Sequence, residues 1–272
     1  MDLGLRGKRG IVVGGSRGIG KAIAFELARE GVDLTIAARN IDTLNRTAEE
    51  IHAETGQHVA TLACDVSSRD QVDTMVEEAA AQMGGVHILV NSGSAPGGST
   101  TATGYIDTIV DEDFLSDFDV KYVGALRCAR ACIPHMQAAG WGRIVNISGL
   151  NARIAGNLSG GARNTSLVHF TKTLSTQLGR DGITVNCIHP GLTRTESVTQ
   201  MFQAGADRQG IPLEEYETNS YSKGGAFANA IGRMVDASEV ADLTTFLCSD
   251  RAWSITGEVI AAGGGVDTSV YY

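Results

Sequence analysis

The fold that we expect for this chain is decided near its N-terminus, by the stretch Gly10-Ile11-Val12-Val13-Gly14-Gly15-Ser16-Arg17-Gly18-Ile19-Gly20. A short apolar strand runs directly into glycines, and Lys21–Glu30 then has the apolar spacing of an amphipathic helix that Gly31 ends. Asp33–Ala38 predicts a second strand. Glycines at the first turn of such a βαβ unit let backbone N–H groups approach a pyrophosphate at the helix N-terminus. We therefore predict a dinucleotide-binding loop with contacts from Gly14, Ser16, Arg17, Gly18, Ile19 and Gly20.

The end of the second predicted strand indicates which dinucleotide binds. No Asp or Glu stands there to accept from a ribose 2′-hydroxyl, and Arg39 follows the strand instead. Together with Arg17 it offers two guanidinium groups, which pair with phosphate through a planar fork. The pattern favours NADP(H) over NAD(H). The alternative is that Arg39 is a solvated residue after the strand.

Strands and helices alternate through the following residues. We predict a helix over 41–55, a strand over 58–63, a helix over 68–83 and a strand over 86–90, and a further central helix includes 160–172. This spacing predicts an α/β fold: one domain over 1–272, with a doubly wound, Rossmann-like parallel sheet in a three-layer αβα arrangement. The ligand then belongs at the carboxyl ends of the strands, where Asp65 could accept from an adenine amino group.

Composition excludes several classes of function. The chain has 272 residues and a net charge of -9, without a Lys/Arg cluster that could follow a nucleic-acid backbone. It has no apolar run near the roughly 20 residues that span a bilayer, so we expect neither nucleic acid nor membrane as a partner. The five cysteines favour free thiols in a reducing compartment, which predicts a cytoplasmic protein. No His/Asp cluster stands near Cys128 and Cys132, so we predict no metal site.

Several motifs together resemble those of the short-chain dehydrogenases/reductases over essentially the full chain. They are the glycine loop 14–20, Cys64-Asp65-Val66, Asn91-Ser92-Gly93-Ser94, Gly142-Arg143-Ile144-Val145-Asn146-Ile147-Ser148, the run from Gly182 to His189-Pro190-Gly191, and Ile255-Thr256-Gly257 through Gly264. The resemblance implies NADP(H)-dependent hydride transfer between a small-molecule carbonyl and its alcohol. It also implies a homo-oligomer, a dimer or tetramer, with the terminal Tyr271-Tyr272 at an interface. The cofactor contacts that it implies are Asp65, Val66, Asn91, Gly93, Pro190, Gly191, Thr193 and Thr195.

The catalytic residues of that family are missing from their expected positions. The family uses an Asn, a Ser and a Tyr-x-x-x-Lys pair, and this chain has no Tyr-x-x-x-Lys anywhere. Aligned on Phe170-Thr171-Lys172 and Gly142-Arg143, the Tyr, Lys and Ser positions hold Gly160, Asn164 and Gly149. The Asn position holds Lys121.

Lys121 and Asn164 look like a reciprocal exchange between neighbouring helices. Our hypothesis is that Lys121 reaches into the space left at Gly160 and acts as proton donor or as electrostatic anchor, while Asn164 bonds the nicotinamide ribose. Desolvation would lower the lysine pKa toward neutrality, as acid–base chemistry needs. Ser148 could take the serine role. The alternatives are that Lys121 extends to solvent or pairs with a carboxylate, and that Ser148 bonds only locally.

The residues at about 192–232 are expected to form an irregular substrate lid, because this connection is long and mixes aromatic with polar residues. Arg153 and Arg163 flank the expected cleft and are interpreted as solvated charges rather than substrate ligands. His169 and His189 are interpreted as structural.

Two other functions stay open beside an atypical oxidoreductase. One is a non-catalytic nucleotide-binding subunit or sensor that pairs with an intact homologue. The other is a lyase, dehydratase or isomerase that binds the nucleotide without consuming it.

Overall fold

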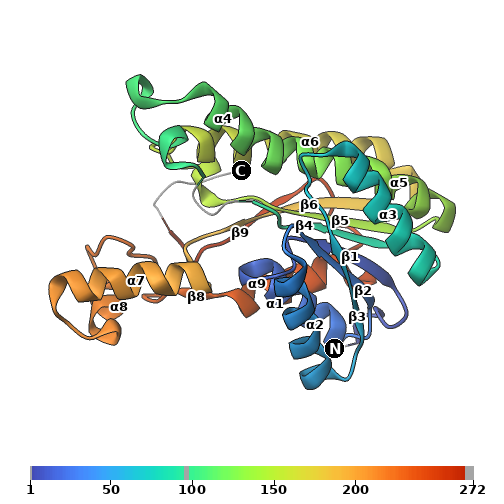
Figure 1. Cartoon of the computed structure of the whole chain (residues 1–272), viewed down its shortest axis with the longest axis horizontal. Helices are drawn as coiled ribbons and strands as arrows, with labels where there is room; N and C mark the ends of the chain where they lie inside the picture. Colours follow the sequence, from blue (N-terminus) through green and yellow to red (C-terminus); the bar gives the residue numbers. More distant parts are fainter. Residues whose placement is uncertain (1, 95–97, 267–272) are drawn as a thin grey trace.

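A computed structural model describes residues 2–94 and 98–266, which form a parallel sheet between two layers of helices (Figure 1). The seven strands lie in the order β3-β2-β1-β4-β5-β6-β9, all parallel. The order reverses between β1 and β4, and ligands of such sheets bind at this switch point. The strands are β1 (Arg9–Val13), β2 (Asp33–Ala38), β3 (Val59–Ala63), β4 (Ile88–Asn91), β5 (Gly142–Ile147), β6 (Ile183–Pro190) and β9 (Val259–Ala262).

Helices cover both faces of the sheet, as Figure 1 shows. On one face lie α1 (Gly18–Arg29), α2 (Ile41–Thr55) and α9 (Ala237–Leu247). On the other lie α3 (Arg69–Met83), α5 (Gly124–Ala139) and α6 (Leu158–Leu178). The short α4 (Asp111–Phe118) precedes α5, and a π-helical turn, η3 (Asp119–Val123), joins the two. Single 3₁₀ turns lie between the longer elements: η1 (Thr100–Ala102), η2 (Ile106–Thr108), η4 (Leu150–Ala152), η5 (Gly179–Asp181) and η6 (Asp250–Ala252).

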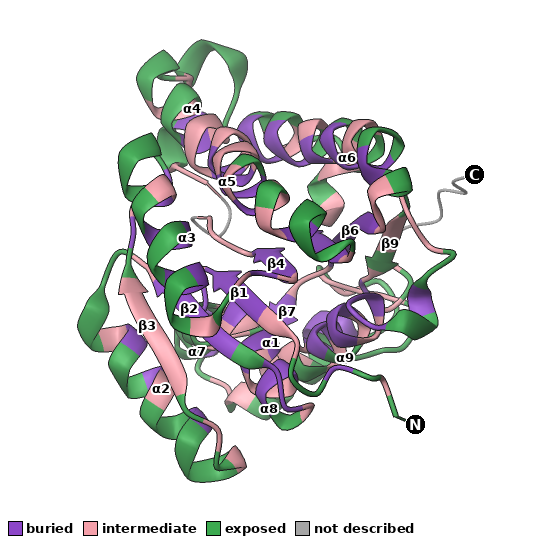
Figure 2. Ribbon diagram, turned by 90° about the vertical axis from the view of Figure 1, so that its right-hand side faces the viewer, coloured by how far each residue is buried: buried purple, intermediate pink, exposed green. Residues whose placement is uncertain are grey.

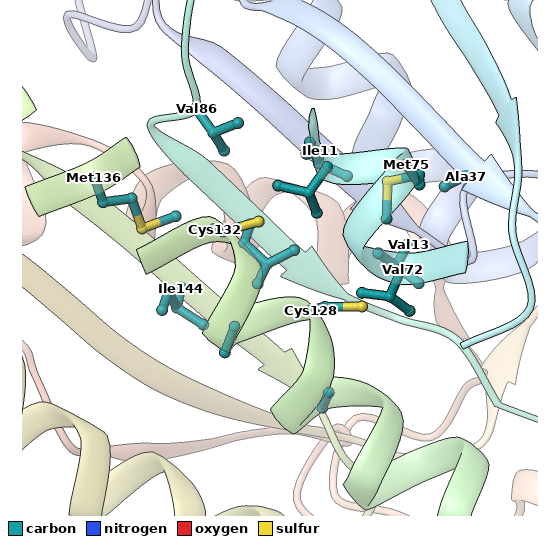
Figure 3. Packing of buried hydrophobic residues seen from close by; sticks show 14 of the residues in the cluster. Ile11, Val13, Ala37, Val72, Met75, Val86, Cys128, Cys132, Met136 and Ile144 are labelled. Carbon is teal, nitrogen blue, oxygen red and sulfur yellow. The ribbon is translucent and has the colours of Figure 1, made fainter. Parts of the chain in front are cut away.

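Each face of the sheet has its own apolar core. Buried strands alternate their side chains between the two cores, and the outer helix faces are exposed (Figure 2). Figure 3 shows Cys128, Cys132 and Met136 of α5, which belong to one apolar cluster with Ile11 of β1 and Ile144 of β5. All five cysteines are buried free thiols.

The sequence predicted β1 to β4 and α1 to α3 to within a few residues. Helices α2 and α3 begin where the side chains of Asn40 and Ser68 accept from Thr43 N and Gln71 N, and they end at left-handed Gly56 and Gly84. The predicted doubly wound parallel sheet is confirmed. The first helix begins at Gly18 rather than Lys21, because the glycine loop itself contributes its first turn.

The expectation of an irregular segment at about 192–232 was wrong. The segment contains α7 (Glu196–Gln209) and α8 (Leu213–Tyr221), and the strand β7 (Thr193–Arg194) pairs with β8 (Val235–Asp236). The aromatic residues are the reason, because they form a third apolar cluster between the two helices, centred on Phe202, Tyr221 and Met234.

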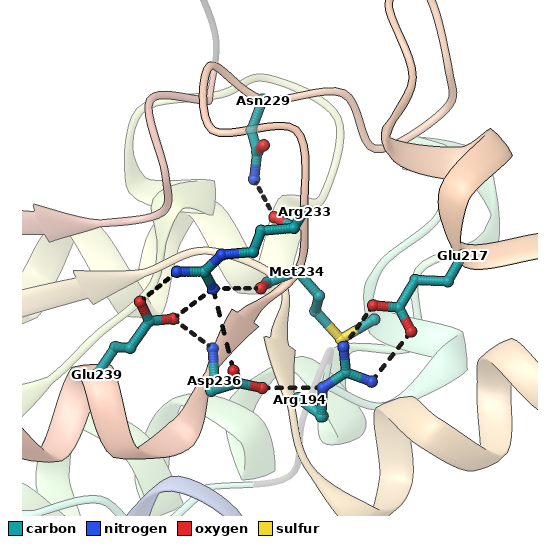
Figure 4. A network of polar contacts seen from close by, with 7 residues as sticks. All are labelled: Arg194, Glu217, Asn229, Arg233, Met234, Asp236 and Glu239. Atoms are coloured by element: carbon teal, nitrogen blue, oxygen red, sulfur yellow. Dashed lines mark hydrogen bonds and ion pairs between the residues drawn. The ribbon is translucent and has the colours of Figure 1, made fainter. Parts of the chain in front are cut away.

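Ion pairs hold this segment to the rest of the fold (Figure 4). Arg194 pairs with Glu217 of α8 and with Asp236 of β8, and Arg233 pairs with Glu239 of α9. Residues 271 and 272, which we expected at a subunit interface, lie outside the described residues. None of the described helices is both long and apolar enough to cross a bilayer.

Candidate active site

The glycine loop is held close to the carboxyl end of β4. A Cβ added at Gly14 would lie 2.7 Å from Gly93 N, and one at Gly20 would lie 2.1 Å from Gly14 O. No side chain fits at either position. Gly14 and Gly18 also have positive φ angles, of 80° and 55°. The loop therefore exposes backbone at the switch point, where we predicted the dinucleotide.

The N-terminus of α1 already binds an anionic group. Gly18 N donates to Glu196 Oε2 over 2.9 Å, and the Thr195 methyl lies 3.2 Å from the position of a Gly18 Cβ. Helix N-termini bind carboxylates and phosphates alike, since free N–H groups and the helix dipole favour negative charge. The loop thus fits a pyrophosphate, and α7 begins beside it. Glu196 could not be identified from the sequence, because no sequence pattern connects it to Gly18, which lies far from it in the chain.

The residues predicted to contact the adenosine half of the cofactor include both arginines and an aspartate. Arg17 and Arg39 are exposed, as a phosphate site requires. Asp65 accepts from Ser67 N and Ser67 Oγ, and these bonds, with a smaller contribution from Arg39, hold the pKa of Asp65 below its ordinary value. Val66 is buried beside this carboxylate.

The predicted contacts near the nicotinamide lie at the ends of β4 and β6. Asn91 Nδ2 donates to Asn146 Oδ1 over 2.9 Å, which links β4 to β5. Pro190 ends β6, and Thr193 Oγ1 donates to Gly191 O over 2.9 Å. Thr195 caps α7 by accepting from Val198 N.

Carboxamide groups fill the places where the resemblance implied Tyr and Ser side chains. A Cβ at Gly160 would lie 2.8 Å from Asn157 Oδ1 and 2.9 Å from Asn151 Nδ2. A Cβ at Gly149 would lie 2.8 Å from Asn164 Nδ2. The glycines and the asparagines therefore form a matched set, in which each glycine makes room for an amide.

Lys121 points inward beside this set. Only 7% of its surface is exposed, and Nζ donates to Ser94 Oγ over 3.3 Å and to Ser148 O over 3.4 Å. Within the described residues no carboxylate lies at ion-pair distance from Nζ. Burial, with the nearby positive charge of Arg163, lowers the pKa of Lys121 to about 7. The sequence alternative of solvent exposure is therefore wrong for Lys121, and carboxylate pairing is not found among the residues that the structure describes.

The three predicted catalytic residues converge at the end of β5. Ser148 accepts from Lys121 through its carbonyl, and its Oγ donates to Asn164 O over 3.0 Å. Asn164 Oδ1 is buried without a hydrogen-bond partner among the described residues. A small cavity beside Lys121 is lined by Val13, Val66, Asn91, Gly93, Val120, Gly124, Ala125 and Leu167. A wider cavity, lined by Arg194, Leu213 and Tyr221 among others, lies under α8 and does not include Lys121.

The other candidate residues, two histidines and an arginine, differ in how far they are buried. His169 is exposed on α6. His189 is buried at the end of β6, and burial, with the charges of Arg153 and Lys121, lowers its pKa to about 4, so it is neutral. The interpretation of Arg163 as a solvated charge was wrong, since it is only 4% exposed.

Comparison with known proteins agrees with this geometry. Residues 13–267 match a family model described as "Enoyl-(Acyl carrier protein) reductase". The chain is 31% identical to the "NADPH-dependent reductase BacG" of Bacillus subtilis, over 95% of this chain and 97% of that protein. It is 30% identical to the "3-oxoacyl-[acyl-carrier-protein] reductase FabG" of Pseudomonas aeruginosa, over 97% of this chain and 99% of that protein.

Among solved structures, an L-sorbose reductase from Gluconobacter frateurii, complexed with NADPH and L-sorbose, superposes with a TM-score of 0.91. It is 30% identical, and the match covers 99% of this chain and all of that one. With the sheet order, the glycine loop and the family match in agreement, the chain belongs to the short-chain dehydrogenase/reductase family.

Proposed function

We propose that this protein is an NADPH-dependent carbonyl reductase in which Lys121 takes the place of the family's tyrosine as proton donor. The observation that carries the proposal is the inward-facing Lys121, buried without a carboxylate partner among the described residues and with a pKa of about 7. A general acid works best when its pKa lies near the operating pH. Relatives with reductase names, and a structural neighbour that holds NADPH, support the cofactor and the direction.

Each residue of the site has its own role in the proposed reaction. When bound, NADPH supplies the hydride that reaches the carbonyl carbon. The Lys121 ammonium gives one proton to the carbonyl oxygen, becomes a neutral amine and regains a proton from water, so one hydride and one proton make the alcohol. Ser94 Oγ and Ser148 O orient the amine. The Asn164 amide would bond a ribose hydroxyl, and Arg17 and Arg39 would hold a 2′-phosphate.

The test begins with calorimetric titration of NADPH and NADH into the protein. A carbonyl panel follows that includes L-sorbose and a 3-oxoacyl thioester, monitored for NADPH oxidation. We expect tighter binding of NADPH than of NADH, and turnover of at least one carbonyl. Lys121→Met should then lose about 10²–10⁴ in kcat, the usual contribution of a positioned acid. Lys172→Met, which removes an exposed lysine from α6, is the matched control. Wild-type turnover in Lys121→Met contradicts the proposal.

A second candidate, a non-catalytic nucleotide-binding subunit or sensor, is favoured by the asparagine side chains that fill the tyrosine place over Gly160. Tight NADPH binding without turnover of any carbonyl supports it. A lyase, dehydratase or isomerase is the third candidate. It converts a carbonyl compound without any change in nicotinamide absorbance.

The cellular compartment, the oligomeric state and the substrate lid are also proposals. Five buried free thiols support a reducing compartment such as the cytoplasm. Exposed apolar side chains on α4 and just before it, including Leu115, Tyr105 and Ile106, support a homo-oligomer. Within 192–232, Glu196 at the start of α7 contacts the cofactor loop, as part of a substrate lid would.

A further inference from the structure

Arg194 lies between two predicted cofactor contacts, Thr193 and Thr195. Strand β7 consists of Thr193 and Arg194, and its register sets Arg194 opposite Asp236 of β8. Side chains alternate between the two sides of a strand. Thr193 is accordingly buried, and Arg194 is exposed. Thr195 then lies on the side of the glycine loop, where its methyl is 3.2 Å from the position of a Gly18 Cβ.

The guanidinium group of Arg194 bridges two elements of the fold (Figure 4). Its Nε donates to Asp236 Oδ1 over 2.8 Å, and its Nη1 donates to Glu217 Oε2 of α8 over 3.0 Å. Its Nη2 donates to the other carboxylate oxygen of Glu217, so this pair is bidentate. Among the described residues, Glu217 forms an ion pair only with Arg194. A planar fork that binds two carboxylates fixes the orientation of the side chain as well as neutralising charge.

Asp236 gives this bridge a fixed attachment point. It is the N-cap residue of α9, and its backbone N–H donates to Glu239 Oε2 over 2.8 Å. Helix α9 packs against α1, the helix that begins in the glycine loop. Arg194 therefore connects the part of the fold that carries the glycine loop to α8. A shift of β7 relative to that part stretches the ion pairs of Arg194.

We propose that Arg194 is a positioning residue for the nicotinamide half of NADPH, because it holds Thr193 and Thr195 in place from the opposite side of β7. The inference rests on the proposed function and on the cofactor contacts expected for these two threonines. Without the ion pairs of Arg194, β7 spends less of its time in the position that binds the cofactor. The apparent affinity then falls in proportion to the time lost. Helix α8 takes part in this positioning through Glu217.

Calorimetric titration of NADPH, and of adenosine 2′,5′-bisphosphate as its adenosine half, locates the effect. Arg194→Gln should weaken NADPH binding about three- to tenfold, as when the binding-competent fraction falls to about a third to a tenth. Adenosine 2′,5′-bisphosphate should bind as to wild type, because its predicted contacts Arg17, Arg39 and Asp65 lie at α1, β2 and β3. Arg208→Gln, which removes an exposed arginine from the last turn of α7, is the matched control and should bind both ligands normally.

A second variant tests the link to α8. Glu217→Gln should weaken NADPH binding less than Arg194→Gln does, since the pair with Asp236 remains. The double variant Arg194→Gln/Glu217→Gln should bind NADPH as Arg194→Gln does, because Glu217 acts through Arg194. The effect of Arg194→Gln should also persist in a Glu196→Gln background, where the carboxylate at the glycine loop has lost its charge.

A purely structural role of Arg194 predicts another pattern. Equal weakening of both ligands, in protein that circular dichroism shows to be folded, would overturn the inference. Unchanged NADPH binding in Arg194→Gln, additive losses in the double variant, or an effect that vanishes with Glu196→Gln would also overturn it. If Arg194→Gln fails to fold, the same comparison of the two ligands in Glu217→Gln decides.

Turnover separates this inference from the proposed function. If the binding contrast appears but wild-type protein reduces no carbonyl, the positioning role of Arg194 stands and the reductase proposal fails. If wild-type protein reduces a carbonyl while Arg194→Gln binds NADPH normally, the reductase proposal stands and the role of Arg194 fails. Absence of NADPH binding to wild-type protein overturns both.

Discussion

The buried position of Lys121 lowers the free energy of unfolding, because the folded protein disfavours the charged form of this side chain. Between pH of about 7 and 10.5, its folded and ordinary pKa values, the unfolded chain binds more protons than the folded protein does. Stability therefore rises with pH through this window, and the cost is complete below it. Such a cost is typical of a functional residue rather than of a structural one.

The first prediction follows from this rise of stability with pH. Lys121→Met should be more stable than wild type at pH 7, and the difference should shrink by about 2 kcal/mol at pH 9, by the usual 1.36 kcal/mol for each pKa unit. Urea unfolding at both pH values measures the two free energies. A difference that does not depend on pH would show that Lys121 is charged in the folded protein.

A second prediction concerns two neighbouring glycines at the start of α6. Gly160→Ala should lower the free energy of unfolding by about 1 kcal/mol, because its Cβ displaces Asn157, whose side chain accepts from Gly160 N and caps the helix. Gly161→Ala is the control, since its Cβ meets only Asn151 O at 3.5 Å. It should stabilise the protein by about 0.4–1 kcal/mol. Thermal and urea unfolding measure both, and equal effects would contradict the packing described for Gly160.

At the scale of elements, the contact between α7 and the glycine loop predicts competition with the cofactor. Glu196 holds the N–H of Gly18 over 2.9 Å, at the place suited to the pyrophosphate. Glu196→Gln should therefore tighten NADPH binding roughly two- to fivefold, the value of one charge at a helix terminus. Calorimetry measures the dissociation constant. Glu214→Gln, at the exposed first turn of α8, is the control, and unchanged or weaker binding in Glu196→Gln would rule out competition.

Elements with strong local signals could be predicted from the sequence, and those that depend on distant partners could not. The glycine loop and the amphipathic helices carry their own turn residues, caps and apolar spacing. Helices α7 and α8 were missed because their apolar residues face each other across the Phe202 cluster, a pairing that one sequence does not reveal. The π-turn η3 around Lys121 was also missed, since no residue pattern announces it.

At the scale of the whole molecule, the sheet brings together side chains from α4–α5, β5 and α6 that sequence could only name separately. Lys121, Ser148 and Asn164 lie together at the end of β5. The space over Gly160 that the sequence hypothesis gave to Lys121 is instead filled by Asn157 and Asn151. The burial of Arg163 and of Asp117 could not be predicted from the sequence, because charged residues usually face solvent.

The measurement that tests the role of Lys121 most directly is the pH dependence of kcat for carbonyl reduction with saturating NADPH. An acid must be protonated to act, so kcat should fall as pH rises through about 7, the pKa of Lys121. The same profile in Lys121→Met should be low and flat. A wild-type kcat that stays constant from pH of about 6 to 9, or a fall that survives in Lys121→Met, would show that another group delivers the proton.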